Sequence, residues 1–200
     1  MKLNPQEGAT RIGDERYILV RAASMSVFFL EFIRNMYLGI DDQTVVESAA
    51  KVLFSMAENI GIRDAQAFHE KAKVDDPVAK LSTGPVHFSY SGWAFVDISP
   101  ESTPTPDEDY YLLYDHPYSF EASSWIEERG SVNFCTCFMN AGYSSGWCQE
   151  SFGIKLTARE LLCQARGDAH CRFLMSQPHR LEEFCQRYRV ANPEFFPEEG

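Results

Sequence analysis

Apolar side chains in the first third of the chain recur at the spacing of amphipathic helices. One stripe predicts a helix over residues 24–38, closed by Gly39, and its members are Met25, Phe28, Phe29, Phe32, Ile33 and Met36. A second stripe predicts a helix over 42–59, and a third helix is expected over 65–73. Ahead of them, the apolar run at 17–20 is typical of a short strand.

The pattern changes after Pro77, where aromatic and β-branched residues begin to alternate with other side chains. Over residues 84–98 this period of two predicts two strands with Gly92 between them, and the first alternating set is Val86, Phe88 and Tyr90. A further strand is expected over 110–114, followed by a short helix over 117–128.

The last third of the chain predicts a helix, a hairpin and a second helix. Helical spacing indicates the first helix over 133–152, and the last over 181–188. The segments 156–165 and 170–175 flank a Gly-Asp turn and therefore predict a β-hairpin. Together these elements predict an α+β fold, with an antiparallel sheet flanked by helices.

The 200-residue chain carries a net charge of −11, which limits the classes of partner that it can bind. An acidic chain is repelled by nucleic-acid phosphates and by anionic membrane surfaces, so neither is expected as a partner. Its 15 Phe, nine Tyr and three Trp supply enough apolar volume for a core with a cavity inside it. No repeat or clear linker divides the sequence, so one domain is expected over residues 1–200.

The N-terminal sequence and the number of cysteines indicate the cellular compartment of the protein. No apolar signal-peptide region follows Met1, and the most apolar segment, 22–36, is interrupted by Glu31 and Arg34. A cytoplasmic protein is therefore expected. In a reducing cytosol, six cysteines serve more often as metal ligands or free thiols than in disulfides.

The last third of the chain also holds a candidate metal site, made of Cys137, Glu160, Cys163 and Cys171. A turn at residues 167–168 brings Cys163 and Cys171 together, as a tetrahedral site requires. In a regular strand Glu160 and Cys163 point to opposite faces, so a bulge, a strong twist or a helical turn is needed if both bind one ion. The alternative is a group of buried, inert thiols, and Cys135 is the next candidate ligand.

Three motifs follow one another here: Gly142-Tyr143-Ser144-Ser145-Gly146, Glu160-Leu161-Leu162-Cys163 and Gly167-Asp168-Ala169-His170-Cys171-Arg172-Phe173. Their order resembles the signature of the 4VR (vinyl-4-reductase or hydrocarbon-binding) family. Looser matches resemble the sensory domains of phenol- and xylene-responsive bacterial transcription activators, and they are Glu7-Gly8, Ile12–Arg16, Ser24-Met25, Gly84-Pro85 and Ser119-Phe120-Glu121. The resemblance covers residues 7–176.

The resemblance implies a structural zinc ion that supports the C-terminal hairpin. In those activators Cys, Glu, Cys and Cys hold the zinc, and the matching positions here are Cys137, Glu160, Cys163 and Cys171. Four protein ligands close the site and leave no open position for catalysis. Such a site keeps a net negative charge, and the basic residues expected to offset it are Lys155, Arg159, Arg166 and Arg172.

The resemblance also implies a buried pocket for an aromatic effector. The family's polar His and Trp positions fall on Phe88 and His116, so His116 is expected to supply the single hydrogen bond. Strand alternation would put His87 and Phe88 on opposite faces. The other wall candidates are Tyr114, Trp147, Phe173, Trp93 and Phe95. The ligand is expected to be small, hydrophobic and aromatic. Because the family's polar pair is not retained, phenol itself is in doubt, and a larger or more apolar ligand is an equal alternative.

Three functions remain open at this point. The first is a zinc-containing sensor that binds a hydrophobic, aromatic ligand and signals to a separate regulatory protein. The second is an enzyme or accessory of tetrapyrrole vinyl reduction, although no nucleotide-binding or catalytic motif supports it. The third is an interaction module with the fold of vesicle-tethering subunits. The retained cysteine ligands favour the sensor.

The resemblance divides the chain into three parts. Residues 7–40 are expected to form a dimerisation segment, 41–176 the ligand-binding core, and 177–200 a C-terminal helix with an acidic tail. Related domains pair through their N-terminal segments, so a homodimer is expected. Its contact is predicted at the 17–20 strand and the Phe-rich helix that follows.

Overall fold

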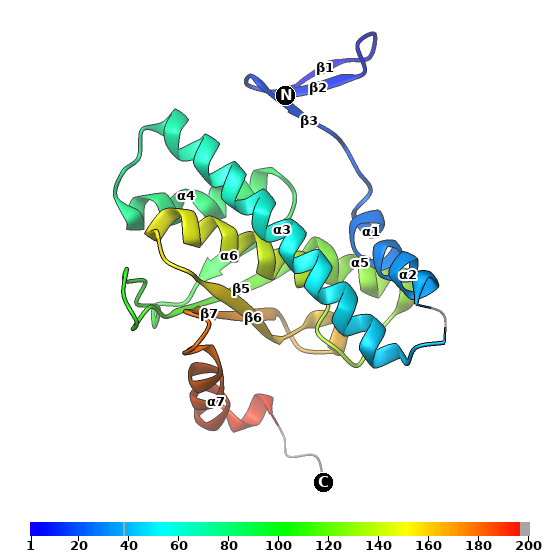
Figure 1. Ribbon diagram of the computed structural model, residues 1–200, viewed down its shortest axis with the longest axis vertical. Coiled ribbons are helices and arrows are strands. Elements are labelled where there is room, and N and C mark those ends of the chain that lie inside the picture. Colours follow the sequence, from blue (N-terminus) through cyan, green and yellow to red (C-terminus); the bar gives the residue numbers. More distant parts are fainter. Residues whose placement is uncertain (38, 197–200) are drawn as a thin grey trace.

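The computed structural model describes residues 1–37 and 39–196, and it is an α+β fold with two antiparallel sheets (Figure 1). A three-stranded sheet, ordered β1-β2-β3, forms at the N-terminus, and a four-stranded sheet, ordered β4-β5-β7-β6, forms the centre of the body. The predicted antiparallel sheet flanked by helices is confirmed. The end of the predicted acidic tail, 197–200, lies outside the described residues.

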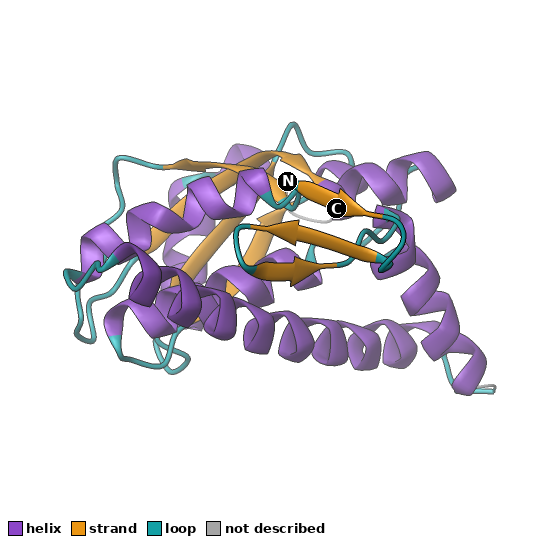
Figure 2. Ribbon diagram, turned by 90° about the horizontal axis from the view of Figure 1, so that it is seen from above, coloured by secondary structure: helices purple, strands orange, loops and turns teal. Residues whose placement is uncertain are grey.

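The N-terminal arm, residues 1–21, is a small sheet joined to the body by an extended segment (Figures 1 and 2). Its strands are β1 (Lys2–Asn4), β2 (Ala9–Ile12) and β3 (Glu15–Tyr17). The strand predicted over 17–20 is wrong in position, because pairing with β2 ends at Tyr17. Ile18 and Leu19 beyond it are 79% and 75% exposed.

The helix predicted over 24–38 is two helices. They are α1 (Ala22–Met25) and α2 (Val27–Met36). The chain leaves the helical region at Ser26, where φ is −124° and ψ is −80°. The division lets α2 turn one apolar face toward the core, and the buried residues on that face are Val27, Leu30 and Ile33.

The two helices predicted over 42–59 and 65–73 are one continuous helix, α3 (Asp42–Ala72). The Asp41 side chain caps it by accepting a hydrogen bond from the Thr44 backbone N–H at 2.9 Å. Gly61 does not end the helix, because its missing side chain lets α6 approach (a Cβ atom there would lie 2.2 Å from the Tyr143 carbonyl oxygen). Among residues 1–37 and 39–196, no helix combines the length and apolar character that crossing a membrane requires.

The strand predicted from residue 84 is wrong, because Pro77–Tyr90 is a helix, α4. Asp76 caps it through the Ala79 N–H at 2.8 Å, and Pro77 occupies its first turn, where a missing N–H costs little. Of the alternating residues, Phe88 is buried whereas Val86 and Tyr90 are exposed. These three residues therefore do not form one buried face of a strand, because only Phe88 is turned toward the core.

The central sheet is covered on both faces (Figure 1). Its strands are all antiparallel and comprise β4 (Ala94–Ile98), β5 (Leu112–Ser119), β6 (Thr157–Leu162) and β7 (Cys171–Ser176). Along β5, Leu112 and Tyr114 face the side of α6, whereas Leu113 packs with α7 (Leu181–Ala191). The predicted C-terminal hairpin and final helix are confirmed as β6–β7 and α7.

Two helices flank the loop that leads to the candidate metal site. They are α5 (Phe120–Arg129) and α6 (Phe138–Phe152). The predicted helix over 117–128 begins three residues late because Ser119 is its N-cap, accepting from the Ala122 N–H at 3.3 Å. The helix predicted from residue 133 begins only at Phe138, since the Thr136 and Cys137 N–H groups are directed at Cys163 and Glu160 instead.

The β6–β7 ladder contains the irregularity that the metal site requires. Glu160 pairs with Phe173 and Leu162 pairs with Arg172, so the register shifts between Glu160 and Leu162. A 3₁₀ turn, Gln164–Arg166, follows Cys163. The expected irregularity between Glu160 and Cys163 is present as this register shift, whereas the 3₁₀ turn lies beyond Cys163.

Candidate functional site

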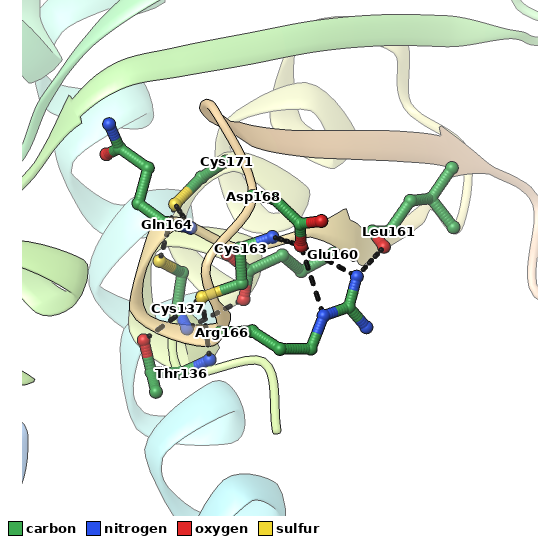
Figure 3. Close-up of polar contacts among 9 residues, drawn as sticks. All are labelled: Thr136, Cys137, Glu160, Leu161, Cys163, Gln164, Arg166, Asp168 and Cys171. Atoms are coloured by element: carbon green, nitrogen blue, oxygen red, sulfur yellow. Dashed lines mark hydrogen bonds and ion pairs between the residues drawn. The ribbon is translucent and has the colours of Figure 1, made fainter. Parts of the chain in front are cut away.

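Four side chains from four points of the chain converge beside the start of α6 (Figure 3). One ligand atom from each lies within 4.8 Å of all the others, and the four residues are Cys137, Glu160, Cys163 and Cys171. We refer to them as the metal cluster. Cys137 is the N-cap of α6, Cys171 opens β7, and the other two stand on either side of the end of β6.

Backbone N–H groups point at the cluster from the surrounding turns (Figure 3). The Thr136 N–H donates to the Cys163 sulfur and the Gln164 N–H to the Cys171 sulfur, both at 3.4 Å. The Cys137 N–H donates to a Glu160 carboxylate oxygen at 2.8 Å. Such donors favour anionic sulfur and oxygen, which are the forms that bind metal ions.

The turn of the hairpin is fixed by its own polar contacts. Gly167 adopts φ +108°, a left-handed conformation that glycine tolerates. The neighbouring Asp168 carboxylate accepts the Cys163 N–H at 2.7 Å and the Arg166 guanidinium at 2.7 Å. These contacts hold Cys163 and Cys171 at the spacing that the sequence predicted.

The electrostatics of the cluster suit a cation. Burial raises the pKa of Cys137 and of Glu160, whereas hydrogen bonds from the neighbouring thiols, that of Cys135 first, lower the pKa of Cys163. Hydrogen bonds join these groups, and the Cys137 Sγ atom donates to the Cys171 Sγ atom at 3.6 Å. The Oε1 atom of Glu160 is buried and makes no hydrogen bond. A divalent cation would replace the hydrogen-bonded protons and give this oxygen a partner, so the donor set fits a tetrahedral ion such as zinc.

The four basic residues expected to offset the charge of the site each pair with a carboxylate elsewhere. These pairs are Lys155 with Glu58, Arg159 with Glu182, Arg166 with Asp168, and Arg172 with Asp115. Arg166 lies near the cluster through Asp168. These four cations therefore neutralise carboxylates around the cluster, and none of them pairs with a residue of the cluster itself.

Sequence reasoning did not assign a role to Glu121, which fixes the start of α6. Its carboxylate is fully buried and accepts the N–H groups of Met139 at 3.0 Å and Asn140 at 2.8 Å. Burial raises its pKa to about 8. A carboxylate near a helix N-terminus is a recognised stabilising feature. Glu121 belongs to α5, however, so the sequence does not reveal that its carboxylate lies at the N-terminus of α6.

A second feature lies between α4, α6 and the central sheet, and it is an apolar cavity of about 40 Å³. Four of the predicted pocket residues line it: Phe88, Tyr114, His116 and Trp147. The sequence did not single out the remaining wall, which includes Leu81, Gly84, Pro85, Tyr143, Ser144 and Cys148. Several of these were missed because the segment before residue 90 was taken for a strand.

Among the polar side chains that line this cavity, His116 is the one without a hydrogen-bond partner. It is fully buried, and neither ring nitrogen has a hydrogen-bond partner. Burial lowers its pKa to about 3, so the imidazole is neutral and offers one donor and one acceptor. Its ring lies 4.5 Å from that of Phe173 and 5.5 Å from that of Phe88, measured between centroids. The nearby Tyr114 hydroxyl is already satisfied by Ser144 at 2.5 Å.

The other predicted pocket residues do not line the cavity. Phe173 stacks behind Tyr114, with ring centroids 5.2 Å apart. Trp93 packs on Phe88 but faces outward, and Phe95 is 54% exposed on β4. His87, the neighbour of Phe88 on α4, points away from the cavity and lines a separate groove against the N-terminal arm.

Several solved structures resemble this fold, including the following two. The phenol-responsive sensory domain of the transcription activator PoxR, crystallised with phenol, matches with a TM-score of 0.75 and 21% identity, over 99% of this chain and 92% of that one. A trafficking protein particle complex subunit 3 from Naegleria fowleri, covalently bound to palmitic acid, matches with a TM-score of 0.54 and 11% identity, over 78% of this chain and 93% of that one. At these identities the likeness shows a shared fold.

The comparisons by sequence match a smaller part of the chain than the comparisons by structure. None of the curated proteins compared matches this chain. A family model described as an activator of aromatic catabolism matches residues 1–102, which include the N-terminal arm, α3 and α4. This match covers half of the chain and confirms the resemblance to aromatic-responsive activators, while the 4VR name stays a prediction. The chain therefore belongs to the family of activators of aromatic catabolism.

Proposed function

We propose that this chain is a sensor domain that binds a small, hydrophobic aromatic molecule in the cavity beneath α4 and signals to a regulatory partner. The observation that carries the proposal is His116, a buried imidazole with two unpartnered nitrogens in an otherwise apolar cavity. A small-molecule site has this general form, with apolar walls and few polar groups that fix orientation. Membership of a family of regulators of aromatic catabolism supports the same conclusion.

The ligand class follows from the charge of the cavity. No Asp, Glu, Lys or Arg lines it, and His116 is neutral. An anionic ligand such as benzoate would be desolvated there without a counter-ion, which is strongly unfavourable. A hydroxyl group can satisfy His116, whereas a hydrocarbon leaves both nitrogens unpaired. Phenols are therefore preferred over toluene, and toluene over benzoate.

Ligand entry requires the cavity to enlarge. A cavity of about 150 Å³ holds a benzene ring in a well-packed protein, whereas the cavity here is about 40 Å³. Binding energy therefore favours a packing of the domain with a larger cavity over the packing described here. A shift between two such packings is how ligand binding would be communicated to a partner.

Isothermal titration calorimetry with phenol, toluene and benzoate tests the proposal. We expect the order phenol, toluene, benzoate in decreasing affinity. His116→Phe keeps an aromatic ring but removes both nitrogens, so phenol affinity should fall about tenfold while toluene affinity changes little. Phe95→Leu, at an exposed position on β4, is the matched control. Absence of saturable binding by all three compounds, or equal loss for phenol and toluene in His116→Phe, would contradict the proposal.

We also propose that the metal cluster holds one structural zinc ion. Cys137, Cys163 and Cys171 would bind it through sulfur and Glu160 through the carboxylate, which is a closed coordination set. The ion would supply folding energy by tying α6 to the β6–β7 hairpin. Elemental analysis of protein purified without chelators should find about one zinc per chain. A preparation that is fully folded and contains no metal would contradict this.

A homodimer formed through the N-terminal segment 7–40 is the third part of the proposal. The described part of this segment exposes large apolar side chains, namely Ile12, Ile18, Leu19, Val20, Phe32, Met36 and Tyr37. Exposed apolar groups gathered on one segment are typical of an interaction surface. Light scattering at micromolar concentration should give the mass of two chains. A monomer that persists up to the highest soluble concentration would contradict it.

A further inference from the structure

Helix α4 both lines the cavity and packs on α6. Leu81, Pro85 and Phe88, spaced by four and three residues, face the cavity. Gly84 borders the cavity as well, and its missing side chain lets the Trp147 indole pack against the helix (a Cβ atom there would lie 2.8 Å from the indole nitrogen). The helix is therefore at once a wall of the cavity and a layer packed on α6.

The middle of α4 is a weak helix. Residues 82–85 are Ser, Thr, Gly and Pro, and each disfavours a helix interior. The Ser82 hydroxyl donates to the Val78 carbonyl at 2.8 Å, which is a contact that bends helices. Pro85 has no N–H, so the Leu81 carbonyl lacks its helical donor. The weak turn lies at the border of the cavity, where a wall would have to move.

Two of the other walls, α6 and β5, cannot yield as easily. Gly142 and Gly146 let α6 contact the backbone of α3, and a Cβ atom on Gly146 would lie 2.0 Å from the Glu58 carbonyl oxygen. The opposite wall is β5, which is hydrogen-bonded on both sides, to β4 and to β7. The edge strand β4 adds Val96 and Ile98 to the lining, but α4 contributes more of it and contains the weak turn, so α4 is the wall best placed to enlarge the cavity.

Side-chain hydrogen bonds tie α4 to the rest of the body. The Trp147 Nε1–H donates to the Lys80 carbonyl at 3.2 Å, and three further side chains form a group that ends at His87. The Tyr143 hydroxyl donates to the Asp64 carboxylate at 2.8 Å, and it lies 3.0 Å from the His87 Nδ1 atom. A phenol hydroxyl has one proton, and it is given to Asp64 on α3. His87 on α4 must therefore donate its Nδ1–H to the Tyr143 oxygen. We call Asp64, Tyr143 and His87 the latch, because their chain of two hydrogen bonds joins α3, α6 and α4.

The latch lies between the cavity and the N-terminal arm. The Tyr143 ring lines the cavity, whereas Asp64 and His87 line a groove of about 710 Å³ between the body and the arm. Tyr17 of the arm borders the same groove, and the Asp64 carboxylate, after burial, contributes to raising its pKa. Movement at the latch therefore reaches residues of the arm directly.

We propose that α4 is the movable wall of the cavity, and that the latch of Asp64, Tyr143 and His87 holds it closed. The proposal rests on the proposed function for the identity of the ligand but not for the latch itself. When α4 moves outward, the His87–Tyr143 hydrogen bond breaks and the cavity gains volume. The groove against the N-terminal arm changes at the same time, which links ligand uptake to the segment proposed as the dimer contact.

Hydrogen–deuterium exchange on the full chain without ligand tests the latch. Tyr143→Phe removes the hydroxyl but keeps the ring, so the amides of α4 should exchange about tenfold faster, while those of α6 and β5 are unchanged. Tyr114→Phe is the matched control, because it removes another hydroxyl of the cavity wall that is bonded to Ser144 and not to α4. In that variant α4 should exchange as in the parent chain.

A second pair of variants keeps the test decisive if Tyr143→Phe folds poorly. His87 is only half-buried, so His87→Ala should fold and release α4 as Tyr143→Phe does. His87→Gln retains an N–H donor and should restore slow exchange in part. Unchanged α4 exchange in both Tyr143→Phe and His87→Ala would overturn the latch.

The ligand arm of the experiment uses phenol as the probe. Phenol should associate about tenfold faster with Tyr143→Phe than with the parent chain, because more molecules have α4 released. Faster α4 exchange without any phenol binding would support the latch and reject the proposed ligand. Phenol binding with an unchanged association rate and unchanged α4 exchange would support the sensor and reject the latch.

Discussion

Two sites share helix α6, with the metal cluster at its N-cap and the cavity along its later turns. They are also neighbours in the sheet, because His116 of the cavity pairs with Cys171 of the cluster across β5 and β7. The cluster is assembled already, with four ligand atoms within 4.8 Å, whereas the cavity of about 40 Å³ is too small for an aromatic ring. One site is therefore preorganised, and the other must change to work.

The difference has a physical origin in the elements that surround each site. Turns with fixed hydrogen bonds, such as the Asp168 contacts to Cys163 and Arg166, hold the cluster. The cavity is bordered by a helix whose centre contains Gly84 and Pro85. A rigid cluster beside a helix that can move suits a sensor. The displacement caused by a ligand is then confined to the side of the domain where α4 lies. The predictions below test this contrast.

The largest effect is expected at the metal cluster. Cys163→Ala removes one of the three sulfur ligands of the proposed zinc ion, so the ion would be lost and unfolding should become easier by about 4 kcal/mol or more. Chemical denaturation with and without a chelator measures this. Cys185→Ala, at a buried cysteine within α7, is the control and should cost only about 1 kcal/mol. Equal losses for the two variants would show that the cluster is an ordinary set of core thiols.

A smaller effect on stability should distinguish α6, the rigid wall of the cavity, from α4, the wall proposed to move. In Gly146→Ala the new Cβ would overlap the Glu58 carbonyl, and separating α3 from α6 should cost about 3 kcal/mol. In Gly84→Ala the Cβ would lie 2.8 Å from the nitrogen of the buried Trp147 indole, so the indole must move, but helix propensity improves by about 1 kcal/mol. We therefore expect a smaller loss of stability for Gly84→Ala than for Gly146→Ala. Similar denaturation midpoints for both variants would remove the contrast.

The burial of His116 predicts a pH dependence of stability. Its folded pKa of about 3 lies below the unfolded value of 6.5, so its contribution is present above pH 6.5 and is lost as the pH falls toward 3. Between pH 7 and pH 5, the parent chain should lose about 2 kcal/mol more stability than His116→Phe. Denaturant titrations at the two pH values measure the difference. Parallel losses would mean that His116 is protonated, or solvated, in the folded protein.

The smallest effect is expected at Phe95. Sequence position suggested it as a pocket residue, yet it is 54% exposed and lies away from the cavity. Phe95→Ser should change phenol affinity by less than about twofold, whereas Phe88→Ala, which truncates a cavity wall, should change it by tenfold or more. Calorimetry compares the two. A marked loss of affinity in Phe95→Ser would move the binding site to the outer surface of β4.

The sequence predicts these two regions with unequal success, for a physical reason. The metal cluster depends on short-range features, namely the cysteine spacing and the turn at Gly167, which are visible in one stretch of chain. The cavity depends on how distant elements pack. Gly61 continues a helix only because α6 lies against it, and the α4 segment is helical although Gly84 and Pro85 disfavour that state. Tertiary packing overrides local preference at both positions.

The latch could not be predicted for the same reason. Asp64, His87 and Tyr143 come from three helices, and neither their spacing nor their type marks them in the sequence. His87 was considered only as an alternative to Phe88 on a strand. On a helix the two residues point about 100° apart, so one can line the cavity while its neighbour joins the latch.

A crystal structure of the chain with phenol tests the central claim most directly. The account predicts one phenol in the cavity, with its hydroxyl within hydrogen-bonding distance of His116 and with α4 displaced from Tyr143, while the metal cluster stays unchanged. Phenol bound outside the cavity, or bound inside it with α4 in place and the α3–α6 contact opened instead, would contradict the account.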